Sequence, residues 1–194
     1  MLYRWLSKKP NDYVDHISAH VSDAEVGRSK IFISSIGLAE LRPSRVKASG
    51  ETPASIVNKL CAFITVIDTI PDIMSLAGSL KDNRYVCSTD GPKAPERSRE
   101  LSTGDAIQLA TAIWMREYAG VQDLEFHTFD DGKSRNSVDG KTVPMISFQN
   151  WCKGLDGVEY VELAKELKRK KPDHPSCPIP AKNNSTSSKK PPAS

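Results

Sequence analysis

Residues 101–113 read LSTGDAIQLATAI, and this stretch decides the fold. Its apolar residues recur at a spacing of three and four, which predicts a helix with a broad buried face that runs to about residue 118. Asp105 stands at the start of that helix. Because Ser102 and Asp105 form an S-x-x-D pattern, the carboxylate fits a capping box on free backbone N–H groups. Whether Asp105 does more than cap the helix depends on acidic residues elsewhere in the chain.

The composition is that of an ordinary soluble globular protein, and 194 residues are enough for one domain with a sizeable core. No apolar run is long enough to span a bilayer, and the N-terminus lacks the apolar centre of a secretory signal. We therefore expect a cytoplasmic protein that does not enter a membrane. The four cysteines form no C-x-x-C pair, which argues against a zinc knuckle or a disulfide framework.

Charge divides the chain into two parts. Residues 168–194 carry seven Lys or Arg and one Asp, a net charge of +6, which leaves −3 for residues 1–167. We expect residues 1–167 to form the folded domain. The basic part is rich in Pro, Ser, Asn and Lys and nearly free of large apolar residues, so it is expected to be a disordered tail. Its lysines could attract nucleic acid or only keep the chain soluble.

Helices and strands alternate along residues 1–167. Besides the helix described above, helices are predicted at residues 2–6, 11–26, 35–42, 53–63, 72–80 and 158–168. Strands are predicted at residues 30–33, 124–129 and 143–147, residues 64–68 fit either a helix end or a strand, and the polar residues 81–100 fit a loop. This alternation predicts an α/β sandwich on a mostly parallel sheet.

Three acidic residues occupy related positions in this pattern. Glu40 lies in the helix after the first strand, Asp105 begins its helix, and Asp130 directly follows the strand at residues 124–129. Functional crevices of parallel sheets lie beyond the carboxyl ends of the strands, so all three could reach one edge. Carboxylates gathered there would take up protons unless a cation compensates them. Mg²⁺ is the expected cation, because it accepts a few carboxylates and keeps several waters.

Three segments resemble the PIN-domain ribonucleases, and most closely the VapC-type toxins of bacterial toxin–antitoxin pairs. They are ISSIGLAEL at residues 33–41, the opening stretch at 101–113, and LEFHTFDD at 124–131. The resemblance covers about residues 2–150. It implies a PIN-like α/β/α sandwich and Mg²⁺- or Mn²⁺-dependent cleavage of RNA phosphodiester bonds.

The resemblance also implies a role for each acidic residue. Asp105 and Asp130 would hold the metal directly or through water, Glu40 would position a bound water or a second ion, and Asp131 would assist them. A cognate antitoxin protein and a homodimer are the partners that the resemblance implies. The expected cleavage leaves 5′-phosphate and 3′-hydroxyl ends.

The chain departs from the family at its beginning. PIN domains normally begin with an apolar central strand that ends in Asp, whereas this chain begins MLYRWL, which fits the helix that follows such a strand. The comparison therefore predicts that the N-terminal strand and the first acidic ligand are absent, either through a start recorded too late or through a natural shortening. Two functions remain open: a metal-dependent endoribonuclease toxin, and a catalytically inactive or truncated PIN-like binding module.

Histidine and tryptophan residues suggest weaker alternatives. Asp12, His16 and His20 share one helix face and could ligate a transition metal, although a solvated polar face is the simpler explanation. His127 is expected to be a packed or edge residue of its strand. Core or dimer contacts are expected for the tryptophans: Trp5, Trp114 and Trp151.

Overall fold

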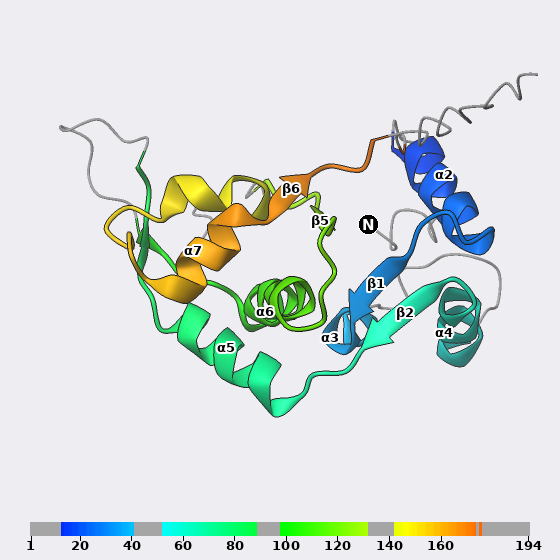
Figure 1. The fold of residues 1–194 in the computed structure, drawn as a ribbon, viewed down its shortest axis with the longest axis horizontal. Coiled ribbons are helices and arrows are strands. Elements are labelled where there is room, and N and C mark those ends of the chain that lie inside the picture. The colour runs from blue at the N-terminus through cyan, green and yellow to red at the C-terminus, as the bar shows by residue number, and fades with distance from the viewer. Residues whose placement is uncertain (1–12, 41–51, 89–97, 132–141, 174, 176–194) are drawn as a thin grey trace, which may run out of the picture.

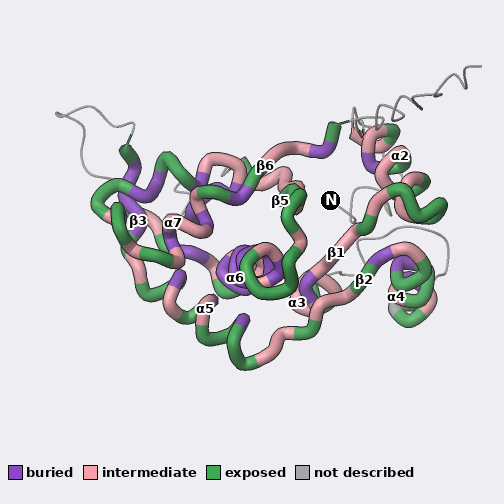
Figure 2. The backbone as a smooth tube through the Cα atoms, viewed as in Figure 1, coloured by how far each residue is buried: buried purple, intermediate pink, exposed green. Residues whose placement is uncertain are grey.

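Helix α6 (Thr103–Glu117) forms the centre of the fold, as the spacing of its apolar residues predicts. The computed structural model describes residues 13–40, 52–88, 98–131, 142–173 and 175. Eight residues of α6 are buried: Ala106, Ile107, Leu109, Ala110, Thr111, Ala112, Ile113 and Met115. They cover most of the circumference of the helix, which Figure 2 shows as the most deeply buried element. A helix that is apolar on so many sides requires neighbours all round.

Two further helices cover α6. Helix α5 (Pro71–Lys81) packs along it, and α7 (Glu159–Glu166) contacts both. The buried residues of α5 and α7 belong to the same core cluster as those of α6: Ile73, Ala77, Leu80, Val161 and Ala164. Full burial of a large aliphatic side chain contributes roughly 1.5–3 kcal/mol, so this three-helix contact makes a large contribution to the stability of the fold.

The parallel strands form two separate pairs. Strand β1 (Ile31–Ser34) pairs with β2 (Ile64–Ile67), and β5 (Glu125–His127) pairs with β6 (Lys168–Lys170), both in parallel. The prediction of an α/β class with mostly parallel pairing is confirmed. Of the two alternatives for residues 64–68, the strand is the one that forms, since β2 covers Ile64–Ile67. Among the described residues, however, the sheets have two strands each and do not join into one.

The prediction of a strand at residues 143–147 is wrong. The chain there enters a 3-10 helix, η2 (Met145–Trp151). Met145, Phe148 and Trp151 recur at every third residue and all three are buried. A repeat of three matches the period of a 3-10 helix, so this segment buries its large side chains against the core without pairing as a strand.

A short antiparallel pair interrupts the stretch predicted as a loop. Strand β3 (Tyr85–Val86) pairs with β4 (Ser98–Arg99). Tyr85 is fully buried, and its hydroxyl donates a hydrogen bond of 2.8 Å to the carbonyl of Leu80. The prediction failed because two paired residues are too few to give a periodic pattern.

The folded part extends beyond the predicted boundary between residues 167 and 168. Residues 168–170 form β6, and Pro172 is fully buried. The guanidinium of Arg169 lies 4.8 Å from the ring centroid of Phe148, so part of the basic segment packs against the domain. The rest of the predicted tail, residue 174 and residues 176–194, lies outside the described residues.

The N-terminal part of the described chain contains three predicted helices: α2 (Val14–Glu25), α3 (Ser35–Ala39) and α4 (Pro53–Cys61). Thr52 caps α4, because its hydroxyl accepts a hydrogen bond from a backbone N–H of the first turn. The helix predicted at residues 2–6 lies outside the described residues.

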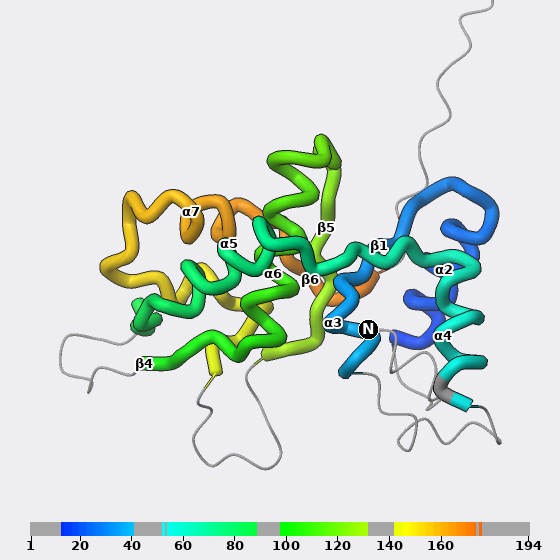
Figure 3. The backbone as a smooth tube through the Cα atoms, turned by 90° about the horizontal axis from the view of Figure 1, so that it is seen from below, coloured from blue at the N-terminus to red at the C-terminus, as the bar shows by residue number. Residues whose placement is uncertain are grey.

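The molecule is elongated in two perpendicular views. Helices α2 and α4 lie at one end, α7 lies at the other, and β1 and β2 run between α4 and α6 (Figures 1 and 3). Within the described residues, every helix is too short or too polar to cross a membrane.

Candidate carboxylate site

Asp105 lies in the first turn of α6, next to the residue that caps the helix. The Ser102 hydroxyl accepts a hydrogen bond of 3.1 Å from the backbone N–H of Asp105. The same hydroxyl donates to Oδ2 of Asp105 over 2.5 Å. Ser102 therefore caps the helix as predicted, whereas the Asp105 carboxylate bonds the serine hydroxyl and not a backbone N–H group. One carboxylate oxygen of Asp105 thus already accepts a hydrogen bond from Ser102.

Glu40 reaches the same turn from the end of α3. Its Oε2 accepts a hydrogen bond of 3.1 Å from Nε2 of Gln108, which lies one turn after Asp105 on α6. Its other oxygen lies over Gly104, where the Cβ of any other residue would collide with Oε1. The absence of a side chain at Gly104 thus lets the Glu40 carboxylate approach the helix backbone.

Asp130 follows β5 and is held by η2. Its backbone N–H donates a hydrogen bond of 3.1 Å to the Thr128 hydroxyl. Its Oδ2 accepts a hydrogen bond of 3.2 Å from the N–H of Met145, and its carbonyl accepts one of 2.9 Å from the N–H of Ile146. Residues 145 and 146, which were predicted as part of a strand, therefore hold Asp130 in place. Asp131, the next residue, is exposed.

Asp130 and Glu40 act electrostatically on Asp105. The pKa of Asp105 is raised from 3.8 to about 6, mainly by burial, although the hydrogen bond from Ser102 opposes the increase. The negative charges of Asp130 and Glu40 contribute the rest of the increase. Three segments that are far apart in the sequence thus bring their carboxylates into electrostatic contact at the N-terminal end of α6.

The carboxylate oxygens of the site suit a hard cation, but they do not form a complete set of protein ligands around one point. Among the described residues, no three His, Cys, Asp or Glu side chains are grouped closely enough to hold a metal ion. Mg²⁺ is typically bound by one or two carboxylates and several waters, so Asp105 and Asp130 suit it in number and kind. The raised pKa of Asp105 also reflects negative charge that a cation would compensate.

Two residues were missed at the level of sequence: Gln108, which contacts Glu40, and Lys81, which contacts the first residue of α6. Gln108 could have been found, because it lies one helical turn from Asp105. Lys81 could not, because it lies at the end of another helix and reaches α6 only in the folded protein, where its Nζ donates to the Thr103 hydroxyl over 2.9 Å. This contact places a cation beside the first residue of α6.

The two histidines of α2 bind the C-terminal segment of the described chain. His16 Nδ1 lies 3.3 Å from the carbonyl oxygen of Pro172, and His20 Nε2 lies 2.7 Å from that of Asp173. His127 is half-buried, and its ring centroid lies 4.9 Å from that of His20. The prediction of a packed or edge histidine is confirmed, and Asp12 lies outside the described residues.

The described tryptophans and two of the described cysteines belong to the core or pack against it. Trp151 is buried, and Trp114 packs against the same core. Cys87 and Cys152 are buried, and Cys61 is exposed. Trp5 and Cys177 lie outside the described residues.

No family model, curated protein or solved structure matches this chain. The assignment of a function therefore depends on the residues of the carboxylate site.

Proposed function

We propose that this protein is a metal-dependent endoribonuclease that hydrolyses RNA phosphodiester bonds, with its site at the N-terminal end of α6. One observation carries the proposal: Glu40, Asp105 and Asp130 come from distant segments and converge closely enough for two of them to raise the pKa of the third. Such a set of carboxylates costs folding free energy as long as no cation is bound. A carboxylate whose pKa is raised by burial and by two neighbouring carboxylates is typical of functional sites.

Each residue has a role in this proposal. Asp105 and Asp130 hold Mg²⁺ or Mn²⁺, with Asp131 as an auxiliary ligand, and Glu40 orients a water through the position that Gln108 gives its carboxylate. When bound, the metal lowers the pKa of water and stabilises charge on the phosphate oxygens. Lys81 is suited to contact a neighbouring RNA phosphate, because its ammonium lies beside the first residue of α6.

The resemblance extends this proposal. It adds a PIN-like α/β/α sandwich as the complete fold, a cytoplasmic location, a cognate antitoxin that keeps the nuclease inactive, and a homodimer. The parallel pairing of β1 with β2 and of β5 with β6 supports the sandwich, because both pairs fit a mostly parallel sheet.

A specific observation favours a second candidate, a catalytically inactive PIN-like binding module. No group of three possible metal ligands is found in the described part of the chain. In addition, one oxygen of Asp105 and one of Glu40 already accept hydrogen bonds from neighbouring side chains. Such a module would bind its partner without any requirement for a divalent cation.

One experiment separates the two candidates. The full chain is incubated with structured RNA in Mg²⁺, in Mn²⁺ and in EDTA, and Mn²⁺ binding is measured independently by calorimetry. We expect cleavage only with a divalent cation, and loss of both cleavage and Mn²⁺ binding in Asp105→Asn. The matched control is Asp156→Asn, since the Asp156 side chain is 85% exposed and pairs only with Lys165 among the described residues.

The outcomes are distinct. Cleavage that persists in EDTA, or in Asp105→Asn at the wild-type rate, contradicts the proposed nuclease. Absence of both cleavage and Mn²⁺ binding in the wild type contradicts the nuclease and supports the binding module.

A further inference from the structure

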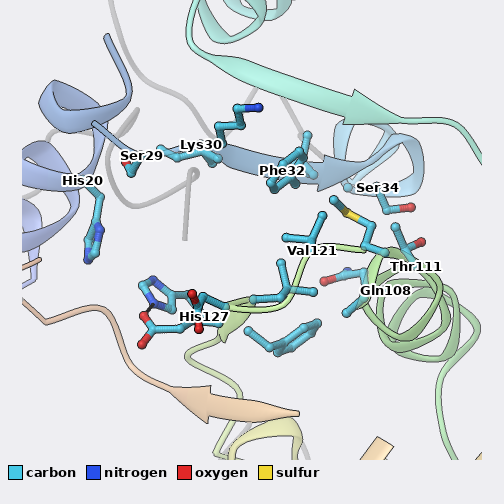
Figure 4. Close-up of a pocket in the computed structure, with 18 of the residues that line it drawn as sticks. His20, Ser29, Lys30, Phe32, Ser34, Gln108, Thr111, Val121 and His127 are labelled. Atoms are coloured by element: carbon cyan, nitrogen blue, oxygen red, sulfur yellow. Dashed lines mark hydrogen bonds and ion pairs between the residues drawn. The ribbon is translucent and has the colours of Figure 1, made fainter. Parts of the chain in front are cut away.

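A cavity of about 1220 Å³ lies between β1 and β5. Figure 4 shows the two strands on opposite sides of it, with α6 at one end. Residues 29–34 line one side, residues 123–127 line the other, and Gln108 and Thr111 of α6 also contribute. The cavity therefore follows the whole length of both strands.

Each of the two strands has one edge with which no described strand pairs. Strand β1 pairs only with β2, and β5 pairs only with β6, among the described residues. The peptide groups of a strand point alternately to its two sides, so each strand has a second row of N–H and C=O groups. Unpaired rows of this kind readily accept another strand.

A buried polar group in the same cavity also lacks a partner. Ser34 is only 5% exposed, and its hydroxyl makes no hydrogen bond within the described residues. It is the last residue of β1 and lines the cavity. A buried hydroxyl without a hydrogen bond costs free energy, and an occupant of the cavity with backbone polar groups would satisfy it.

The cavity has apolar side chains in its middle and charged side chains at its ends. Ile31, Ile33, Leu124 and Phe126 are among its lining residues. Lys30 lies at the end where His20 and His127 approach each other (Figure 4). Glu125 and Lys170 also line this end, but they pair with each other over 3.0 Å. The Lys30 side chain is exposed and makes no ion pair within the described residues. An apolar segment with a carboxylate at the Lys30 end complements this surface.

We propose that this cavity binds an extended segment of a second polypeptide, which adds as a strand between β1 and β5. A strand supplies rows of N–H and C=O groups on two opposite edges, which a compact small molecule cannot do. The segment pairs over about four residues, the length of β1, and is apolar there, with an acidic residue next to Lys30. This proposal does not depend on the proposed nuclease activity.

Hydrogen exchange with synthetic peptides tests the proposal. The acetylated and amidated peptides EVTVI and IVTVE place the acid at either end, and the same peptides with alternate N-methylated amides keep the composition but cannot pair on both edges. We expect one unmethylated peptide to slow amide exchange at least about tenfold in residues 31–34 and 125–127 together. We expect Lys30→Glu to weaken its binding about threefold without changing the melting temperature of the free protein.

Four results would overturn the proposal. They are equal binding of the methylated peptides, absence of protection at millimolar peptide, protection of both strands in the free dilute chain, and protection that rises with protein concentration alone. The third result would mean that the chain's own residues fill the cavity. The fourth would mean that a second copy of the chain fills it.

Discussion

The substitution Asp105→Asn should stabilise the protein at neutral pH, although it removes a residue of the proposed site. Burial is the main cause that raises the pKa of Asp105 from 3.8 to about 6, and the charges of Asp130 and Glu40 add to it. Each pKa unit corresponds to about 1.4 kcal/mol, so ionising Asp105 in the folded state costs about 3 kcal/mol. The pKa already includes the charge-assisted hydrogen bond from Ser102, and the amide oxygen of Asp105→Asn can still accept from that hydroxyl, so the expected gain is up to about 3 kcal/mol.

The sign of the pH dependence follows from the direction of the pKa change. Below pH 3.8 the carboxyl is protonated in both the folded and the unfolded state, so it contributes nothing. Between pH 3.8 and about 6 the unfolded state loses its proton first, and the folding free energy becomes less favourable as the pH rises. Above pH 6 the full cost remains. The advantage of Asp105→Asn should therefore vanish at acidic pH.

Urea denaturation in EDTA, followed by tryptophan fluorescence from pH 3.5 to 8, measures this difference. Asp156→Asn is the control, because an exposed carboxylate should change the free energy of unfolding by less than about 0.5 kcal/mol. Saturating Mg²⁺ should stabilise the wild type and not Asp105→Asn, if the proposed site binds the ion. An Asn variant that is less stable than the wild type at pH 7.5, or a difference that is independent of pH, would refute the reasoning.

Three further predictions concern the site and the core. Gly104→Ala should displace the Glu40 carboxylate and thereby lower the pKa of Asp105, which an NMR titration measures. The control is Gly78→Ala, which has open space around its Cβ and should only raise the free energy of unfolding by about 0.5–1 kcal/mol. An unchanged Asp105 titration in Gly104→Ala would exclude the contact. Leu109→Ala should cost about 2–5 kcal/mol in denaturant unfolding, because Leu109 is fully buried in α6, and a cost below about 1 kcal/mol would contradict its place in the core. Burial lowers the pKa of His127 below 6.5, so the unfolded state binds its proton more readily and stability should fall as the pH drops below that value; His127→Gln should reduce this fall in acid denaturation, and an unaltered acid limb would exclude His127 as its cause.

The sequence by itself determined the features that depend on near neighbours. The three-and-four spacing of apolar residues located α6, and the Thr52-Pro53 and Ser102 signals located two helix starts. The positions of Glu40, Asp105 and Asp130 after a strand or at a helix start were also visible before folding. Helix periodicity and capping involve residues within a few positions of one another, so a single sequence contains the information.

Only the tertiary structure decided what lies beside what. The apolar residues 143–147 fit a strand equally well by composition, and burial of Met145, Phe148 and Trp151 against the core makes the segment η2 instead. Similarly, residues 168–170 became β6 because β5 offers a partner, although the surrounding composition is that of a disordered segment. Strand formation depends on the partner that a distant segment provides, and local propensity does not report it.

The carboxylate site shows the same division. The sequence supplied the three acidic residues, but the approach of Glu40 over Gly104 and the hold of η2 on Asp130 exist only in the folded chain. The raised pKa of Asp105 likewise arises from burial and from charges on other segments. Residue types are fixed by the sequence, whereas desolvation and charge–charge distances belong to the packed structure, because both depend on segments that are far apart along the chain.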